Sequence, residues 1–194
     1  GVMQEDEDAY YTRSSERLRH KERSITNWDY ERMILQHFPD IHKVKCINHA
    51  STTSFYQPGH LLIVVVPNLL NQNAVDPLKP KADKNTLENI SNLLKAHSSP
   101  WVTHHVSNPF YEPVMVSVRI KLKTGFEYNY YEKTIDQNLQ QYLSPWIDNM
   151  SSVNFEGKIT QSMIVKLLED LEFIDFVSDV WLSHSVDGGS SFTH

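Results

Sequence analysis

Apolar residues recur along the 194-residue chain at two spacings, one typical of helices and the other of strands. Thr26 to Asp29 resembles a capping box with Asp as its fourth residue, and it predicts the start of a helix that ends before Pro39. Apolar residues three or four positions apart predict further helices over 83–96, 131–143 and 159–171.

Shorter segments carry the patterns of strands. Residues 41–48 alternate between apolar and polar, whereas 60–66 are apolar on both faces and predict the central strand of a sheet. Residues 114–122 alternate strictly, with Val, Ile or Leu at every even position. This segment is therefore expected to place one face on a core and the other toward solvent or a partner. Two more strands are predicted at 102–106 and 174–182.

The predicted elements follow the order α-β-β-α-β and then β-α-α-β. Helices on one face of each sheet would make two small α/β sandwich domains, ferredoxin-like with mainly antiparallel sheets, and hence an α+β fold. Pro109 and Pro113 bracket the expected boundary. We expect domains at 13–108 and 113–183, preceded by a disordered acidic tail at 1–12 and followed by a flexible tail at 184–194.

The charge balance argues against binding to phosphates. The formal net charge is −6, whereas nucleic-acid-binding domains usually carry a basic surplus. No apolar run approaches the roughly 20 residues needed to span a bilayer. Residues 13–23, the basic arm, are locally positive although the whole chain is acidic. Only Glu16 and Glu22 offset the cations Arg13, Arg17, Arg19, Lys21 and Arg23. The basic arm is either a solvated surface or a docking site for an acidic partner.

Residues that could perform catalysis or bind a metal do not form a recognisable motif. The chain has ten histidines, but His104 and His105 adjoin on a predicted strand and so point to opposite faces. The single cysteine, Cys46, lies in an alternating strand and not at an exposed turn or helix start. A Gly-x-Ser-x-Gly elbow and a glycine-rich phosphate loop are both missing from the sequence. We therefore predict no catalytic, cofactor-binding or metal-binding residues, and no enzyme.

Other candidate contact residues lie in the second predicted domain. Arg119, Lys121 and Lys123 share the polar face of the 114–122 strand. Tyr128 and Tyr130 precede a helix, where they either pack at its rim or contribute to an interface. A long proline-containing loop at 67–82 is a further candidate contact surface.

Several short motifs occur in an order that resembles a known family. They are the stretch from Arg17 to Cys46, Pro58-Gly59-His60 before an apolar strand, Tyr111-Glu112-Pro113-Val114, and Phe155-Glu156-Gly157-Lys158-Ile159 followed by Ser162, Ile164 and Glu169. This order is similar to the C-terminal region of baseplate J-like proteins. These proteins form wedges in contractile phage tails and related injection machines.

The resemblance implies a non-catalytic structural subunit, or a fragment of one, in the baseplate of a phage-like contractile injection apparatus. Its implied partners are other baseplate subunits and copies of itself, and it implies no cofactor. It also implies assembly in the bacterial cytoplasm and then a place in a phage tail-like particle. Family members usually carry a long N-terminal part that this sequence lacks.

Two other classes of function remain as alternatives. Paired α/β sandwiches can bind RNA through aromatic residues on a sheet, but the polar face of the 114–122 strand has none. A nucleic-acid-binding module is the alternative to the baseplate subunit, although this face lacks the aromatic residues that it would need. An enzyme is the third possibility, and bound cofactor or turnover in the purified protein would reveal it.

Overall fold

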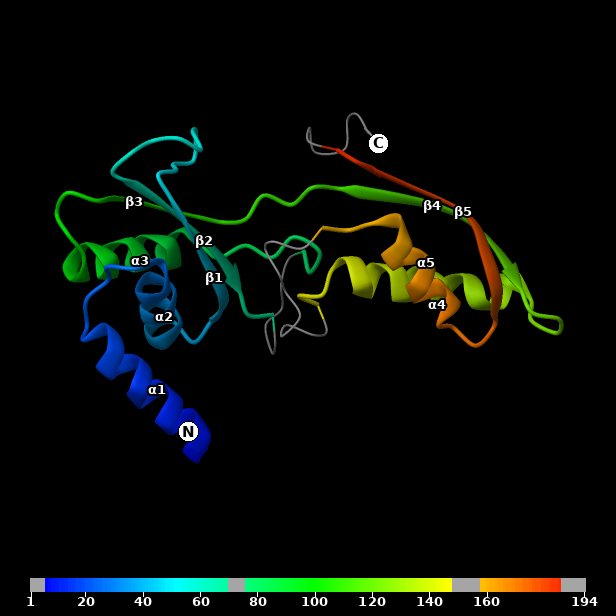
Figure 1. Cartoon of the computed structure of the whole chain (residues 1–194), viewed down its shortest axis with the longest axis horizontal. Helices are drawn as coiled ribbons and strands as arrows, with labels where there is room; N and C mark the ends of the chain where they lie inside the picture. The colour runs from blue at the N-terminus through cyan, green and yellow to red at the C-terminus, as the bar shows by residue number, and fades with distance from the viewer. Residues whose placement is uncertain (1–5, 70–75, 148–157, 186–194) are drawn as a thin grey trace. The chain divides into compact units, whose positions relative to one another are not determined.

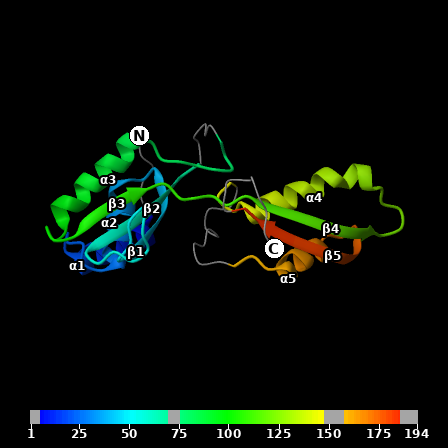
Figure 2. The same cartoon turned by 90° about the horizontal axis from the view of Figure 1, so that it is seen from above.

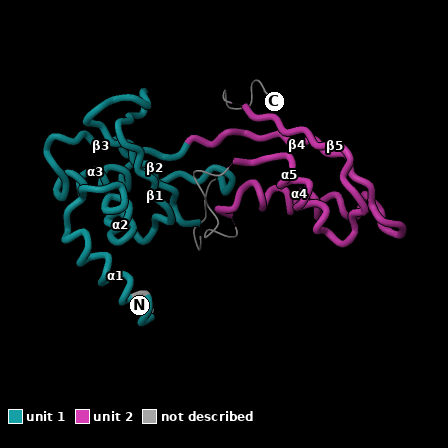
Figure 3. The backbone as a smooth tube through the Cα atoms, in the orientation of Figure 1, with its two compact units in different colours: residues 1–109 teal, residues 110–194 magenta. Residues whose placement is uncertain are grey.

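The computed structural model describes residues 6–69, 76–147 and 158–185 (Figure 1). The chain forms two compact units, Gly1–Pro109 and Phe110–His194 (Figure 3). The mixture of helices with small sheets confirms the predicted α+β class.

Unit 1 contains a three-stranded sheet with the order β1-β2-β3. The strands are β1 (Ile41–Asn48), β2 (His60–Pro67) and β3 (Thr103–Ser107). The central position of β2 agrees with its apolar sequence, and its side chains are buried on both faces. Helices α2 (Asn27–His37) and α3 (Lys84–His97) pack on this sheet and contribute Ile34, Ile90 and Leu94 to the core.

The start of α2 confirms the predicted capping box. The Thr26 hydroxyl accepts a hydrogen bond from the Asp29 backbone N–H at 3.3 Å. In return, the Asp29 carboxylate accepts one from the Thr26 N–H at 2.8 Å. The Glu31 carboxylate also accepts from the Cys46 backbone N–H at 2.9 Å, so α2 is tied to β1 as well as packed on it.

Helix α1 (Glu7–His20) begins inside the segment that was expected to be a disordered tail. The Asp6 carboxylate accepts a hydrogen bond from the Glu7 N–H at 2.9 Å and caps the helix. Acidic residues occupy the first turn and basic residues the last, and these charges stabilise the helix by interacting favourably with its dipole. The polar composition that suggested disorder thus suits a surface helix, while residues 1–5 lie outside the described part of the chain.

Unit 2 contains a two-stranded antiparallel sheet of β4 (Val114–Leu122) and β5 (Ile174–His184). Helices α4 (Tyr128–Leu143) and α5 (Gln161–Glu169) cover one face, α4 alongside β4 and α5 alongside β5 (Figure 2). Their apolar stripes meet the even-numbered residues of β4, as the strict alternation predicted. The core of this unit comprises Ile135, Leu139, Ile164, Leu168, Phe173 and Ile174.

Strand β5 carries two bulges, whereas β4 is regular over its nine residues. Arg119 pairs with Asp179 but Ile120 pairs with Val177, so the pairing skips Ser178. Lys121 then pairs with Phe176 but Leu122 pairs with Ile174, so the pairing also skips Asp175. Such bulges bend the strand that carries them and interrupt the regular row of hydrogen-bonding groups along it.

The ferredoxin-like arrangement is not confirmed. Strand β2 is antiparallel to β1 but parallel to β3, because α3 forms the crossover between β2 and β3. Within the described residues, the sheet of unit 2 has two strands. Alternation along a strand reports which face is buried, but it carries no information about the direction of the neighbouring strand.

Candidate interaction surfaces

The basic arm covers the C-terminal half of α1 and the turn after it. Arg13, Arg17 and Arg19 lie on the helix, and Lys21 is its C-cap in a left-handed conformation with φ of 49°. Arg23 follows in the connection to α2 and is exposed. The structure thus presents the five cations from a helix and a turn.

At least three of these cations are engaged within the chain, among them Arg13, whose guanidinium carbon lies 5.5 Å from the centre of the Tyr10 ring. The Arg19 guanidinium carbon lies 4.3 Å from the centre of the Trp28 ring and joins α1 to the first turn of α2. The Arg17 Nε donates a hydrogen bond to the Glu22 carboxylate at 3.1 Å. Hydrogen bonding and charge from Arg17 hold the pKa of Glu22 below its ordinary value. The arm is therefore less basic toward a partner than its sequence suggests.

Apolar side chains lie beside these charges on α1. Tyr10, Tyr11 and Leu18 are exposed, and Leu18 keeps 75% of its surface in solvent. A shallow groove runs along the helix between Tyr10 and Glu22 and is lined by Arg13, Leu18 and Lys21 among others. Sequence reasoning missed this face, because Tyr10 and Tyr11 fell in the presumed tail.

The uncovered face of the β4–β5 sheet carries Arg119, Lys121 and Lys123, as expected from the alternation of β4. Strand β5 and the turn before it supply the groups that engage these cations. Arg119 forms an ion pair with Asp179 at 2.9 Å, and Lys121 forms one with Asp175 at 3.5 Å. The Lys123 ammonium group donates to a backbone carbonyl at 2.7 Å. This face is consequently close to charge balance and does not offer a basic surface to phosphates.

Strand β5 also places aromatic side chains on this face. Phe176 and Trp181 are 45% and 47% exposed, and the Lys121 ammonium lies 5.2 Å from the centre of the Phe176 ring. Trp181 is in register with Ser117, next to exposed Met115. The sequence of β4 alone does not reveal these rings, since they reach the same face only through the pairing of β5 with β4.

Tyr128 and Tyr130 lie in the first turn of α4, and both are exposed. The Tyr130 ring meets Tyr131 edge to face at 4.9 Å, and Tyr131 stacks on the core residue Phe173 at 4.4 Å. Tyr130 thus extends an aromatic group that is anchored in the core. The pKa of Tyr128 is raised by partial desolvation and by the nearby carboxylates of Glu132 and Asp136.

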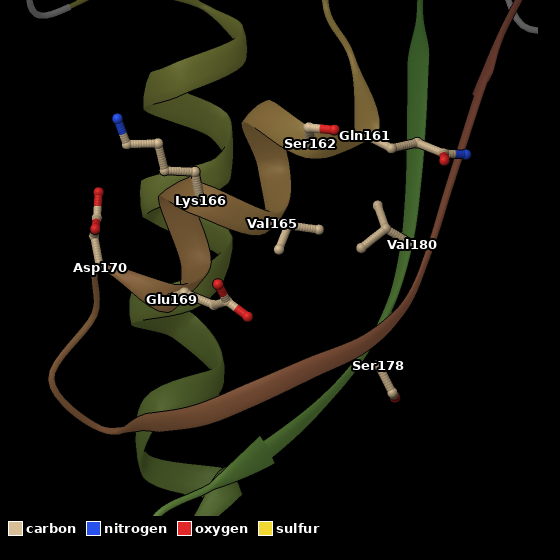
Figure 4. A pocket seen from close by; sticks show the side chains of 8 residues that line it. All are labelled: Gln161, Ser162, Val165, Lys166, Glu169, Asp170, Ser178 and Val180. Carbon is tan, nitrogen blue, oxygen red and sulfur yellow. The ribbon is translucent and has the colours of Figure 1, made fainter.

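A groove separates each strand of this sheet from its neighbouring helix. The groove between β4 and α4 has a volume of about 460 Å³ and is lined by residues 116–120 together with one side of α4. The second groove lies between α5 and β5 (Figure 4). There, Val165 and Val180 point toward each other from the helix and the strand, and Lys166, Glu169 and Asp170 also line the groove.

The cysteine and the histidines of the sheet in unit 1 contact other residues of the same unit. Burial raises the pKa of the Cys46 thiol, which disfavours the reactive thiolate. A ring nitrogen of His105 lies 2.7 Å from one of His60, whereas His104 packs against Tyr30 on the core side. Across 6–69, 76–147 and 158–185, no group of three or more His, Cys, Asp or Glu residues is arranged to hold a metal ion.

The described helices include none with the length and apolar character needed to cross a membrane. The loop at 67–82, predicted as a contact surface, lies partly outside the described residues. Among the described residues, exposed apolar side chains lie on the α1 face, on the uncovered sheet face, at the start of α4, and at Phe55, Tyr56 and Trp101.

Comparisons with known proteins agree on a baseplate. The family model for the PVC11-like baseplate protein matches residues 1–192. A chain in the cryo-EM structure of the anti-feeding prophage (AFP) baseplate, 6-fold symmetrised, superposes with a TM-score of 0.73 at 21% identity. That match covers 93% of this chain and 38% of the AFP baseplate chain, so the present sequence spans well under half of that protein. No curated protein matches.

The prediction of a baseplate component is confirmed. The matching family model is the PVC11-like one, so the more specific prediction of a J-like protein is not confirmed. The likeness to the AFP structure concerns the fold. The match over nearly the whole sequence establishes that the chain belongs to the PVC11-like family of baseplate proteins.

Proposed function

We propose that this chain is a non-catalytic structural part of the baseplate of a contractile injection particle, where it acts by binding neighbouring subunits. The observation that carries the proposal is the family match over residues 1–192. The fold shared with a chain of the AFP baseplate supports it.

The surfaces of both units support a role in protein–protein contact. Contiguous exposed apolar patches on soluble proteins usually mark interaction sites. In unit 1, exposed apolar residues lie on α1 and at Phe55, Tyr56 and Trp101, with Trp101 88% exposed. In unit 2, they lie on the uncovered sheet face and at the start of α4.

The predicted contact residues remain part of this proposal. On α1, Arg13 and Lys21 line the groove that contains Tyr10 and Leu18, so a partner with apolar and acidic side chains would fit there. On the sheet, Phe176 and Trp181 would supply most of the buried area, and the balanced ion pairs would form a polar rim. The partners would be other baseplate subunits and copies of this chain, joined during assembly in the bacterial cytoplasm.

The test is assembly of particles from a complete gene set with the parent protein altered. Arg13→Glu with Lys21→Glu should reduce incorporation of the parent protein into purified particles, as measured by quantitative mass spectrometry. A matched control, Lys84→Glu with Lys95→Glu on the exposed side of α3, makes the same charge change and should leave incorporation intact. Normal baseplates assembled without this protein would overturn the proposal.

A further inference from the structure

The two-stranded sheet of unit 2 leaves the outer edges of both strands without a further strand in the described chain. Unpaired edges present rows of N–H and C=O groups that another strand can pair with. The edge of β5 is interrupted by its bulges at Ser178 and Asp175. The edge of β4 is regular from Val114 to Leu122, so β4 is the strand suited to accept a partner.

The groove between β4 and α4 runs along this edge. Five consecutive residues of β4, 116–120, line it. Because successive side chains of a strand point to opposite faces, five residues in a row line one groove where the backbone of the strand borders it, as it does along an unpaired edge. At about 3.3 Å per residue, the lined edge is roughly 16 Å long, which suits an extended peptide of five or more residues.

The opposite wall is one side of α4. Tyr128, Glu132, Ile135, Asp136 and Leu139 line it, at spacings that place them together on a helix. Ile135 and Leu139 are buried at the base of this wall, while Glu132 and Asp136 are exposed. The nearby inner-facing residues Val116, Val118 and Ile120 are only partly buried, so apolar surface remains for an incoming strand to cover.

We propose that the edge of β4 accepts an extended segment of a neighbouring baseplate subunit as a third strand of this sheet. On the side of the segment that faces α4, apolar residues cover Val116 and Val118, and lysine or arginine residues approach Glu132 and Asp136. The inference rests on the proposed function for the identity of the partner as a baseplate protein. Main-chain hydrogen bonds would provide affinity, and the carboxylates would provide the preference for a cationic segment.

A second copy of this chain fits the site less well. Two copies of β4 paired about a two-fold axis would bring the α4 helices side by side, each with Glu132 and Asp136 directed toward the other groove. Like charges placed together across an interface disfavour association. A cationic strand from a different chain meets no such repulsion.

A direct probe is a fluorescein-labelled nine-residue peptide with valine and lysine in turn at its odd positions and threonine at its even positions, because the odd side chains of a strand share one face. Its control is the same peptide with glutamate in place of lysine. Fluorescence anisotropy with the full chain should show binding of the lysine peptide only. Glu132→Lys with Asp136→Lys should weaken binding by about tenfold or more. Glu169→Lys with Asp170→Lys makes the same charge change beside the β5 edge and should leave the affinity unchanged.

Backbone methylation of the peptide separates strand pairing from general charge attraction. Methyl groups on alternate peptide nitrogens remove the N–H donors of one edge, so one of the two alternating patterns should abolish binding. Equal binding of both methylated peptides, or no effect of the Glu132 and Asp136 changes, would overturn the proposal. So would dimers that bury β4 in both copies. A parent protein that enters particles but binds no peptide would contradict only this inference and leave the proposed function standing.

Discussion

Arg19 lies over the ring of Trp28, with its guanidinium carbon 4.3 Å from the ring centre. This contact links α1 to α2 across the intervening turn, and Arg32 approaches the same ring at 5.8 Å. Since α1 leaves Tyr10, Tyr11 and Leu18 exposed, its attachment to unit 1 relies on few contacts of this kind.

Arg19→Ala should therefore loosen α1 while leaving unit 2 unchanged. A cation–π contact at an exposed site contributes about 0.5–1 kcal/mol, which predicts faster backbone amide hydrogen exchange in α1. Mass-spectrometric exchange of the full chain would measure it. Arg23→Ala is the control, because it removes the same charge from the following turn. Unchanged exchange in α1 of the Arg19 variant would show that the contact does not hold the helix.

Thr26→Ala should destabilise unit 1 by about 1 kcal/mol, because the start of α2 loses the hydroxyl that accepts the Asp29 N–H. Urea unfolding followed by tryptophan fluorescence gives the free energy of unfolding. Thr26→Ser retains the hydroxyl and should recover most of the loss. If the Ala and Ser variants were equally unstable, the capping hydrogen bond would not be the cause.

Ile164→Ala should destabilise unit 2 by about 2–5 kcal/mol, because the Ile164 side chain is fully buried between the helices and the sheet. Amide exchange within β4 and α4, measured in the full chain, reports this unit separately from unit 1. The neighbouring Met163 is 42% exposed, and Met163→Ala should have a much smaller effect. Similar losses for the two variants would contradict the described core.

The pairing of Glu22 with Arg17 should be visible as a function of pH. Since the pKa of Glu22 is lowered in the folded state, its contribution to stability is present above the ordinary glutamate value of about 4.3. The contribution is lost as the pH falls through the lower, folded value. An NMR titration of the Glu22 carboxyl carbon should show the lowered pKa, and Arg17→Ala should return it toward normal. An identical titration in the variant would rule out Arg17 as the cause.

Local patterns predicted much of the fold. The capping box located α2, the apolar run at 60–66 identified the central strand β2, and the alternation in β4 identified its buried face. These features depend on residues close together in sequence, whose spacing reports directly on helix or strand geometry.

Features that depend on pairing over long distances were not predictable in this way. Asp179 engages Arg119 from 60 residues away, so the near neutrality of the uncovered sheet face appears only once β5 is paired with β4. The edge groove likewise combines β4 with a helix that follows in the chain. Sequence reasoning correctly placed Arg119, Lys121 and Lys123 on one face, but it missed Phe176 and Trp181 beside them.

The two skipped residues of β5 decide which of its side chains face inward. Val180 and Val177 both face the helices although they are three positions apart, which an uninterrupted strand does not allow. If Ser178 were paired in regular alternation, Val177 would turn to solvent and Phe176 toward the helices, whereas a strand without Ser178 would keep both side chains on their present faces. The pairing of β5 with β4, and not the residue count along β5, therefore determines which of its side chains join the core.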